Sequence, residues 1–103
     1  KTYMGVYQVT NTSSGKIFIS TTPNLENRWL TVRMQLDMGR HPNSELQRDW
    51  NELGADSFTY QVLEEEEVTE DTDTRWELKQ MKKAWLERLQ PYGDRGYNKP
   101  PKE

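Results

Sequence analysis

The sequence predicts a small α+β domain in which the elements follow the order ββααβα. Three observations lead to this order. Two short runs of alternating apolar and polar residues open the chain, and a third run rich in aromatic and β-branched residues lies in the middle. Three further segments carry apolar residues at helical spacing. Because three strands cannot bury both of their faces alone, we expect the helices to cover the sheet.

The first two strands are expected over residues 3–10 and 16–20. A polar, glycine-containing stretch separates them, which is typical of a β-hairpin turn. Each strand carries one aromatic residue, Tyr7 in the first and Phe18 in the second, and Gly5 leaves backbone room beside the first ring. The hairpin is therefore a candidate floor for a functional site.

The next segment predicts a helix over residues 23–38. Thr22 and Pro23 read as an N-cap followed by proline at the first helical position, and Gly39 is a natural C-terminal stop. Four apolar residues recur at i, i+4, i+7 and i+11 and form one stripe: Leu25, Trp29, Val32 and Leu36.

A shorter helix is expected to open at Asn43 or Ser44 and to end at Gly54. Its predicted apolar face consists of Leu46, Trp50 and Leu53. The third strand is expected over Phe58–Leu63. We expect the acidic stretch that follows, residues 64–71, to be a solvated linker, since runs of like charge usually are.

The last helix is expected to start near Thr72 or Asp73 and to end before Pro91. Its apolar stripe consists of Leu78, Met81, Trp85, Leu86 and Leu89. Lys82 falls in the middle of that stripe, which is unusual for a lysine. Either its stem passes to a nearby edge of the helix, or a polar pocket lies beneath the helix.

Composition limits the possible functions. The 103 residues indicate one domain, expected over residues 1–98, with a disordered tail at 99–103. The absence of cysteine excludes disulfides, thiolate zinc sites and a cysteine nucleophile. No apolar run approaches the roughly 18 residues that a membrane span needs, and no signal peptide is visible, so we expect a cytoplasmic protein without membrane partners.

The charge of the chain is uneven. The net charge of -3 argues mildly against nucleic acid as a partner. Residues 1–51, however, carry six Lys and Arg against four Asp and Glu. A positive face would come from Arg28, Arg33, Arg40 and Arg48.

Sequence motifs for common chemistries are missing. There is no glycine-rich phosphate loop, paired-histidine zinc motif or nucleophile elbow, and the single histidine, His41, reads by itself as a polar loop residue. No carboxylate lies in the middle of an apolar stripe, where a sheltered metal ligand would be expected.

The order of residues nevertheless resembles the GIY-YIG endonucleases. Gly5-Val6-Tyr7 and Phe18-Ile19-Ser20 correspond to the paired motifs that name the family. The match covers nearly the whole chain and continues through Asn24-Leu25-x-x-Arg28-Trp29, Gly39-Arg40-His41-x-Asn43, Leu46-Gln47-x-Asp49-Trp50-Asn51-x-x-Gly54, Phe58 with Val62-Leu63-Glu64, Trp85-Leu86-Glu87 and Gly96-Tyr97-Asn98.

The resemblance implies a three-stranded antiparallel sheet flanked by helices, and a site that cuts DNA phosphodiesters with one divalent metal, usually Mg²⁺. In such a site the metal polarises the phosphate, a phenol or metal-bound water handles the proton, and an arginine neutralises developing charge. Carried over to this sequence, the catalytic positions are Tyr7, Arg28, His41 and Asn98, and the phosphate-binding positions are Arg28, Arg33 and Lys82.

Four positions depart from the family pattern. Phe18 replaces the second tyrosine, Ser20 replaces the glycine of the second motif, and Val32 stands where many members have a polar residue. Lys82 stands at the usual position of the metal-binding glutamate. Repulsion between a lysine ammonium and a divalent ion at about 4 Å amounts to several kcal/mol at intermediate dielectric, so we expect no metal here.

The sequence therefore predicts a domain that binds nucleic-acid phosphates, DNA first, but has lost or weakened metal-dependent cleavage. One alternative is an active Mg²⁺-dependent DNA endonuclease that uses an atypical carboxylate such as Glu77. Another is a protein-interaction or regulatory domain on the same scaffold, with a protein partner. The sequence does not indicate an oligomeric state.

Overall fold

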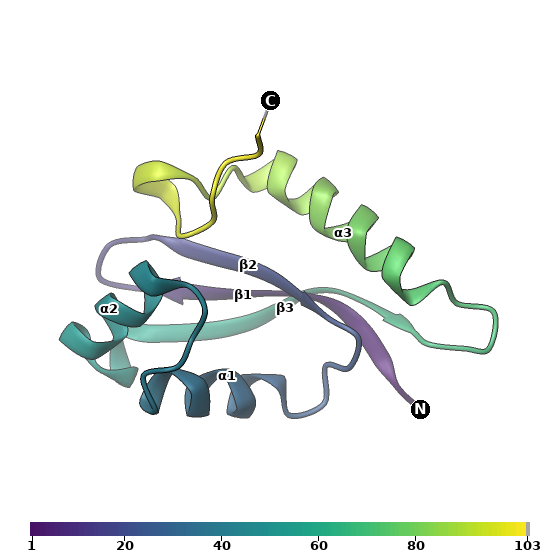
Figure 1. Ribbon diagram of the computed structural model, residues 1–103, viewed down its shortest axis with the longest axis horizontal. Helices are drawn as coiled ribbons and strands as arrows, with labels where there is room; N and C mark the ends of the chain where they lie inside the picture. The colour runs from purple at the N-terminus through teal and green to yellow at the C-terminus, as the bar shows by residue number, and fades with distance from the viewer. Residues whose placement is uncertain (103) are drawn as a thin grey trace.

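The computed structural model describes residues 1–102, and Glu103, at the end of the predicted disordered tail, lies outside the described residues. The main elements are the strands and helices of Figure 1: β1 (Tyr3–Asn11), β2 (Ile17–Thr22), α1 (Arg28–Asp37), α2 (Ser44–Leu53), β3 (Phe58–Glu67) and α3 (Thr74–Leu89). Short 3₁₀ turns occur at Ala55–Ser57 and Gly93–Arg95. This order confirms the predicted α+β class.

The sheet is antiparallel, and its strand order β2-β1-β3 places β1 in the centre. The hairpin register sets Tyr7 opposite Ser20 and Val9 opposite Phe18, which confirms the predicted hairpin. On the other side of β1, the register shifts between Val6 and Tyr7. Such a bulge bends the strand and re-aims the side chains beside it.

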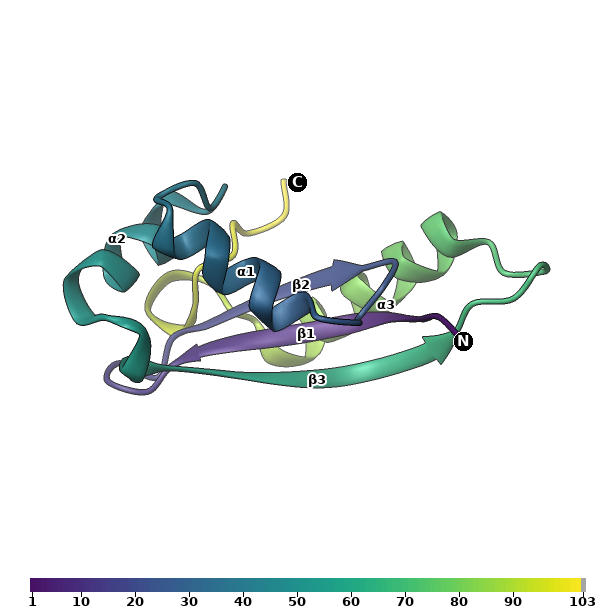
Figure 2. The same cartoon turned by 90° about the horizontal axis from the view of Figure 1, so that it is seen from below.

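The helices cover both faces of the sheet. Helices α1 and α2 lie on one face and α3 lies on the other, as the two views in Figures 1 and 2 agree. Because successive residues of a strand point to opposite faces, Tyr7 packs under α1 and α2 whereas Val6 packs under α3. Two small cores result. The first contains Tyr7, Val9, Val32, Leu36, Leu46, Trp50, Phe58 and Tyr97, and the second contains Met4, Val6, Ile19 and Met81.

Helix α1 begins at Arg28, later than the predicted residue 23. Thr22 ends β2 instead of capping a helix, because its Oγ1 donates to the Asn24 carbonyl at 2.9 Å and accepts from the Asn24 amide at 3.2 Å. Asn27, in the left-handed region at φ 56°, becomes the N-cap. Leu25 therefore lies before the helix and is only partly buried.

The prediction of a solvated linker is wrong for Glu64–Glu67, which form the second half of β3 and pair with Tyr3–Val6. The backbone of β1 extends far enough to bond these residues, while most of their carboxylates stay exposed. Since β3 is an edge strand, these charges also discourage pairing with another chain.

The other helix ends agree with the prediction. Asn43 caps α2 by accepting from the Leu46 amide at 2.9 Å, and Asp73 caps α3 by accepting from the Trp76 amide at 3.1 Å. One face was misassigned, because Leu53 is 45% exposed and does not join the buried side of α2. Among the described residues, no helix has the length and hydropathy of a membrane-spanning segment.

Candidate functional site

A row of three aromatic rings crosses the face of the sheet that α1 and α2 cover. Tyr7 on β1 is 4% exposed, and its ring centroid lies 5.5 Å from that of Tyr60 on β3. Tyr60 in turn stacks on Trp29 of α1, with centroids 5.3 Å apart and planes 15° apart. The rings hold one another in place and form a rigid floor.

Arg28, the first residue of α1, lies at this floor. Its side chain is partly buried, and Nη2 donates to Thr22 Oγ1 at 2.6 Å. No carboxylate in residues 1–102 forms an ion pair with it. A guanidinium that is partly buried, has further N–H donors and lacks a counter-ion is suited to bind an anion.

His41 packs beside the second strand. Its ring meets Phe18 edge-on, with centroids 5.3 Å apart and planes 83° apart. The side chain is buried, and its Nδ1 accepts from the Asn43 amide at 3.0 Å, so the interpretation as a simple polar loop residue is wrong. Burial lowers the pKa of the imidazole, which is therefore neutral near pH 7. The structure brings these two predicted site residues into direct contact.

Asn98 lies at the free edge of β2. Its Oδ1 accepts from the Ile19 amide and its Nδ2 donates to the Ile19 carbonyl, both at 2.9 Å. The two polar ends of the Asn98 amide thus bond the Ile19 backbone in the way that the backbone of a neighbouring strand would. In this arrangement Asn98 positions β2.

A groove of about 740 Å³ opens between β2, the start of α2 and the C-terminal loop. Its lining includes Lys16, Phe18, Asn43, Asn98 and Lys99. Two residues predicted for the site, Phe18 and Asn98, therefore share one groove. Lys16 is not free within it, because its Nζ pairs with Glu45 Oε2 at 2.6 Å.

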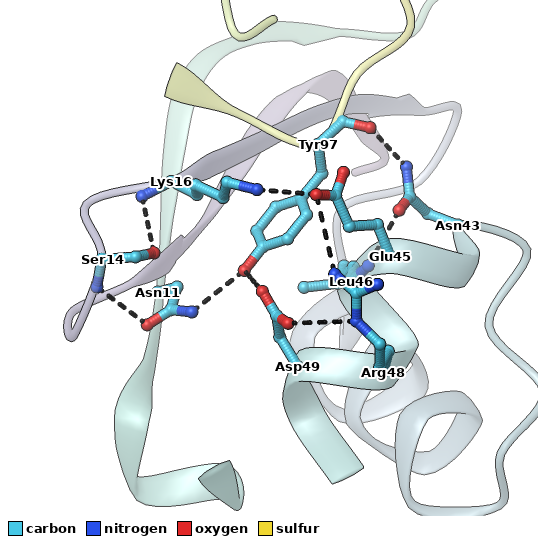
Figure 3. Close-up of polar contacts among 9 residues, drawn as sticks. All are labelled: Asn11, Ser14, Lys16, Asn43, Glu45, Leu46, Arg48, Asp49 and Tyr97. Carbon is cyan, nitrogen blue, oxygen red and sulfur yellow. Dashed lines mark hydrogen bonds and ion pairs between the residues drawn. The ribbon is translucent and has the colours of Figure 1, made fainter. Parts of the chain in front are cut away.

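The far wall of this groove is held by the hydrogen bonds of Tyr97 (Figure 3). The Tyr97 hydroxyl accepts from Asn11 Nδ2 at 3.0 Å and donates to Asp49 Oδ2 at 2.7 Å. The Tyr97 carbonyl accepts from Asn43 Nδ2 at 2.7 Å. These bonds join the C-terminal loop to both β1 and α2, so the groove has a rigid rim.

The remaining predicted positions are Val32 and Arg33 on α1 and Lys82 on α3. Val32 is 1% exposed and belongs to the core under α1. Arg33 is exposed and lies over the ring of Trp29, 5.5 Å from its centroid. Lys82 is partly buried on α3, next to Met81, and thus belongs to the helix on the opposite face of the sheet from Tyr7.

The residues on this face do not fit a divalent metal. Within residues 1–102, no three His, Asp or Glu side chains come close enough together to hold a metal ion. The floor offers phenols, hydroxyls and a guanidinium, whereas Mg²⁺ prefers carboxylate oxygens. The carboxylate of Glu64 on β3 accepts from Trp85 Nε1 of α3 at 2.8 Å, and Glu64 pairs with Val6, which packs under α3.

Sequence reasoning missed Tyr60 and Trp29 as neighbours of Tyr7 and Arg28. The alternation in Phe58-Thr59-Tyr60 indicated that Tyr60 shares a face with Phe58. The register of β3 against β1, which decides what Tyr60 touches, depends on a bulge that the sequence does not reveal.

Comparisons with known proteins agree with this architecture. No protein-family model matches the chain. Over 61 residues, or 59% of the chain, it is 34% identical to Intron-associated endonuclease 1 of Enterobacteria phage T4, and it spans 24% of the length of that protein. It is similar to the solved catalytic domain of the intron endonuclease I-TevI in a glutamate-to-alanine mutant, with TM-score 0.76 and 27% identity over 93% of this chain and 92% of that one. A second structure, of the catalytic domain of homing endonuclease I-TevI, gives TM-score 0.73 and 26% identity over 95% and 99%.

The fold of the chain is thus similar to that of an endonuclease catalytic domain. This similarity agrees with the resemblance to the GIY-YIG endonucleases that the order of the motifs predicts.

Proposed function

We propose that the domain binds nucleic-acid phosphates through Arg28 and has lost or weakened metal-dependent phosphodiester cleavage. The observation that carries this proposal is the Arg28 guanidinium, partly buried beside the aromatic floor and without an ion-pair partner in residues 1–102. A phosphate would supply the missing negative charge. The matched proteins are named endonucleases, so DNA is the ligand to test first.

Each proposed site residue has a role that its contacts support. In this proposal Tyr7 and Arg28 contact the phosphate, and Arg33, which lies above Trp29, supplies a second positive charge. His41 backs Phe18, and Asn98 positions β2.

Two features support weakened cleavage. Phe18 carries no hydroxyl, and the donor set around Arg28 contains no carboxylate cluster. By resemblance, Lys82 stands where the family has its metal-binding glutamate. For its ammonium to take the metal's place, the lysine side chain must reach from α3, which covers the opposite face of the sheet from Tyr7.

Binding is tested by fluorescence anisotropy with a labelled duplex and a labelled single strand across a salt series. We expect affinity to fall as salt rises, and to fall further in Arg28→Ala and Arg33→Ala. Arg75→Ala, an exposed arginine on α3, is the matched control and should bind as the native protein does. Absence of binding to either strand form at low salt would rule out the proposal.

Cleavage is tested by nicking of plasmid DNA with Mg²⁺ or Mn²⁺. We expect weak or no nicking by the native protein and a gain of nicking in Lys82→Glu. Lys83→Glu, one residue further along α3 and exposed, should gain nothing. Robust native nicking that is lost in Tyr7→Phe and in Glu77→Gln would instead establish the active endonuclease with an atypical carboxylate.

One observation favours the alternative of a protein-interaction domain. The outer face of α1 and its C-cap residue expose Leu30, Met34 and Met38 by 50%, 53% and 60%. Neighbouring exposed apolar side chains often mark a protein contact. Failure to bind nucleic acid, together with self-association that is lost in Met34→Asp, would favour this alternative.

A further inference from the structure

The hydroxyl of Tyr60 is buried, and it forms no hydrogen bond with any of the described residues. A phenol can both donate and accept, and buried polar atoms in native proteins nearly always have a partner. Among buried side-chain nitrogen and oxygen atoms in residues 1–102, this oxygen is the single exception. The exception lies on the same aromatic floor as Tyr7 and Arg28.

The position of this hydroxyl is set by packing on both sides of its ring. Tyr60 lies between Tyr7, 5.5 Å away, and Trp29, which stacks on it at 5.3 Å. On β3 it is opposite Val9, one step diagonal to Tyr7. The ring therefore has little freedom to turn its hydroxyl toward another partner.

The charge around the hydroxyl suits a donor to an anion. Burial raises the pKa of Tyr60, nearby Tyr7 raises it further, and the positive charge of Arg28 acts in the opposite direction. The phenol is therefore protonated at neutral pH, and it lies within the field of the guanidinium. One hydrogen-bond donor and one cation thus act on the same region.

We propose that Tyr60 is a phosphate-binding residue of this site, and that its hydroxyl donates to an anionic oxygen held by Arg28. This inference rests on the proposed function. Tyr7 on β1 supplies one phenol of the floor. Because Phe18 on β2 has no hydroxyl, the second phenol comes from Tyr60 on β3. Since the Tyr60 oxygen is shielded from solvent, a neighbouring side chain must move for the ligand to reach it. We take Arg28 to be that side chain, because its charge acts on Tyr60 and one hydrogen bond, to Thr22 Oγ1, holds it in place.

The test compares Tyr60→Phe with Tyr3→Phe, which alters an exposed tyrosine at the start of β1. Binding of a labelled DNA duplex is measured at several salt concentrations, alongside the thermal midpoint of each protein. We expect Tyr60→Phe to weaken binding about tenfold, the effect of one hydrogen bond to a charged group, and Tyr3→Phe to bind normally. The thermal midpoint of Tyr60→Phe should not fall, because no hydrogen bond within the protein is removed.

The salt dependence separates the two residues. A neutral phenol releases no counterion, so Tyr60→Phe should keep the native salt slope, whereas Arg28→Ala should reduce that slope by about one. Native-like affinity in Tyr60→Phe, or a lower thermal midpoint in that variant, would overturn this inference and leave the proposed function standing if Arg28→Ala still weakens binding. A native protein that does not bind DNA would overturn both.

Discussion

Gly5 and Glu64 approach so closely that no side chain fits between them. A Cβ atom on Gly5 would overlap the Glu64 carbonyl oxygen, and it would lie 3.0 Å from Leu25 Cδ1. The bulge between Val6 and Tyr7 begins at the next residue of the strand. The glycine that opens the first motif is thus required by the close approach of two backbones.

Gly5→Ala should destabilise the fold by about 1–3 kcal/mol or more, because backbone atoms must shift to admit the methyl group. The measurement is urea denaturation followed by circular dichroism. Ser13→Ala, an exposed turn residue, should change the free energy of unfolding by less than about 0.5 kcal/mol. Equal stability of Gly5→Ala and the native protein would contradict the close approach.

Asn98 should contribute to the stability of the fold as well as to the candidate site. Replacing it by alanine leaves both polar backbone groups of Ile19 without these partners, which should cost about 1–3 kcal/mol. Asn98→Asp should be worse at neutral pH, because a carboxylate would face the Ile19 carbonyl. The measurement is the denaturation midpoint of each protein, expected to fall in the order native, Asn98→Ala, Asn98→Asp. The opposite order would show that the Asn98 amide does not bond the Ile19 backbone of β2.

The hydroxyl of Tyr97 should make stability depend on alkaline pH. Burial raises its pKa to about 12, from an ordinary value near 10. Between these values the unfolded chain releases the proton while the folded chain retains it, so stability is complete below pH 10 and falls as pH rises toward 12. Tyr97→Phe should remove this component and also leave buried Asn11 Nδ2 without its partner. A native-like alkaline profile in Tyr97→Phe would exclude Tyr97 as its source.

His41 should make the stability of the fold depend on pH below neutrality. Burial lowers the pKa of His41 in the folded protein below the ordinary 6.5. Between the two pKa values, the unfolded chain therefore binds a proton at His41 and the folded chain does not. Its contribution to stability is therefore present above pH 6.5, and it decreases as pH falls through the folded pKa. His41→Gln should show a weaker loss of stability over that window than the native protein. Thermal midpoints at pH 7.5 and pH 5.5 measure the difference, and identical losses would exclude His41.

Local features of the fold were predictable from sequence. The hairpin, the caps at Asn43 and Asp73 and the stop at Gly54 depend on residues within a few positions of one another. The start of α1 was not predicted, because Thr22 signals both a strand end and a cap, and pairing with β1 decided for the strand. The strand at Glu64–Glu67 was also missed because pairing with β1 decides it, and its partner residues, Tyr3–Val6, lie far away in the sequence.

The sequence by itself determined the order of elements, because this depends on residue types and spacing. It also carried the resemblance to the GIY-YIG endonucleases, and that resemblance implied the candidates Tyr7, Arg28, His41 and Asn98. Only the tertiary structure decided that Tyr60 joins Tyr7 and Arg28 on one face. It also decided that the helix carrying Lys82 covers the other face. The physical reason is register: a one-residue shift in a strand moves a side chain to the opposite face, and the bulge beside Tyr7 sets that shift only when β1 and β3 have paired.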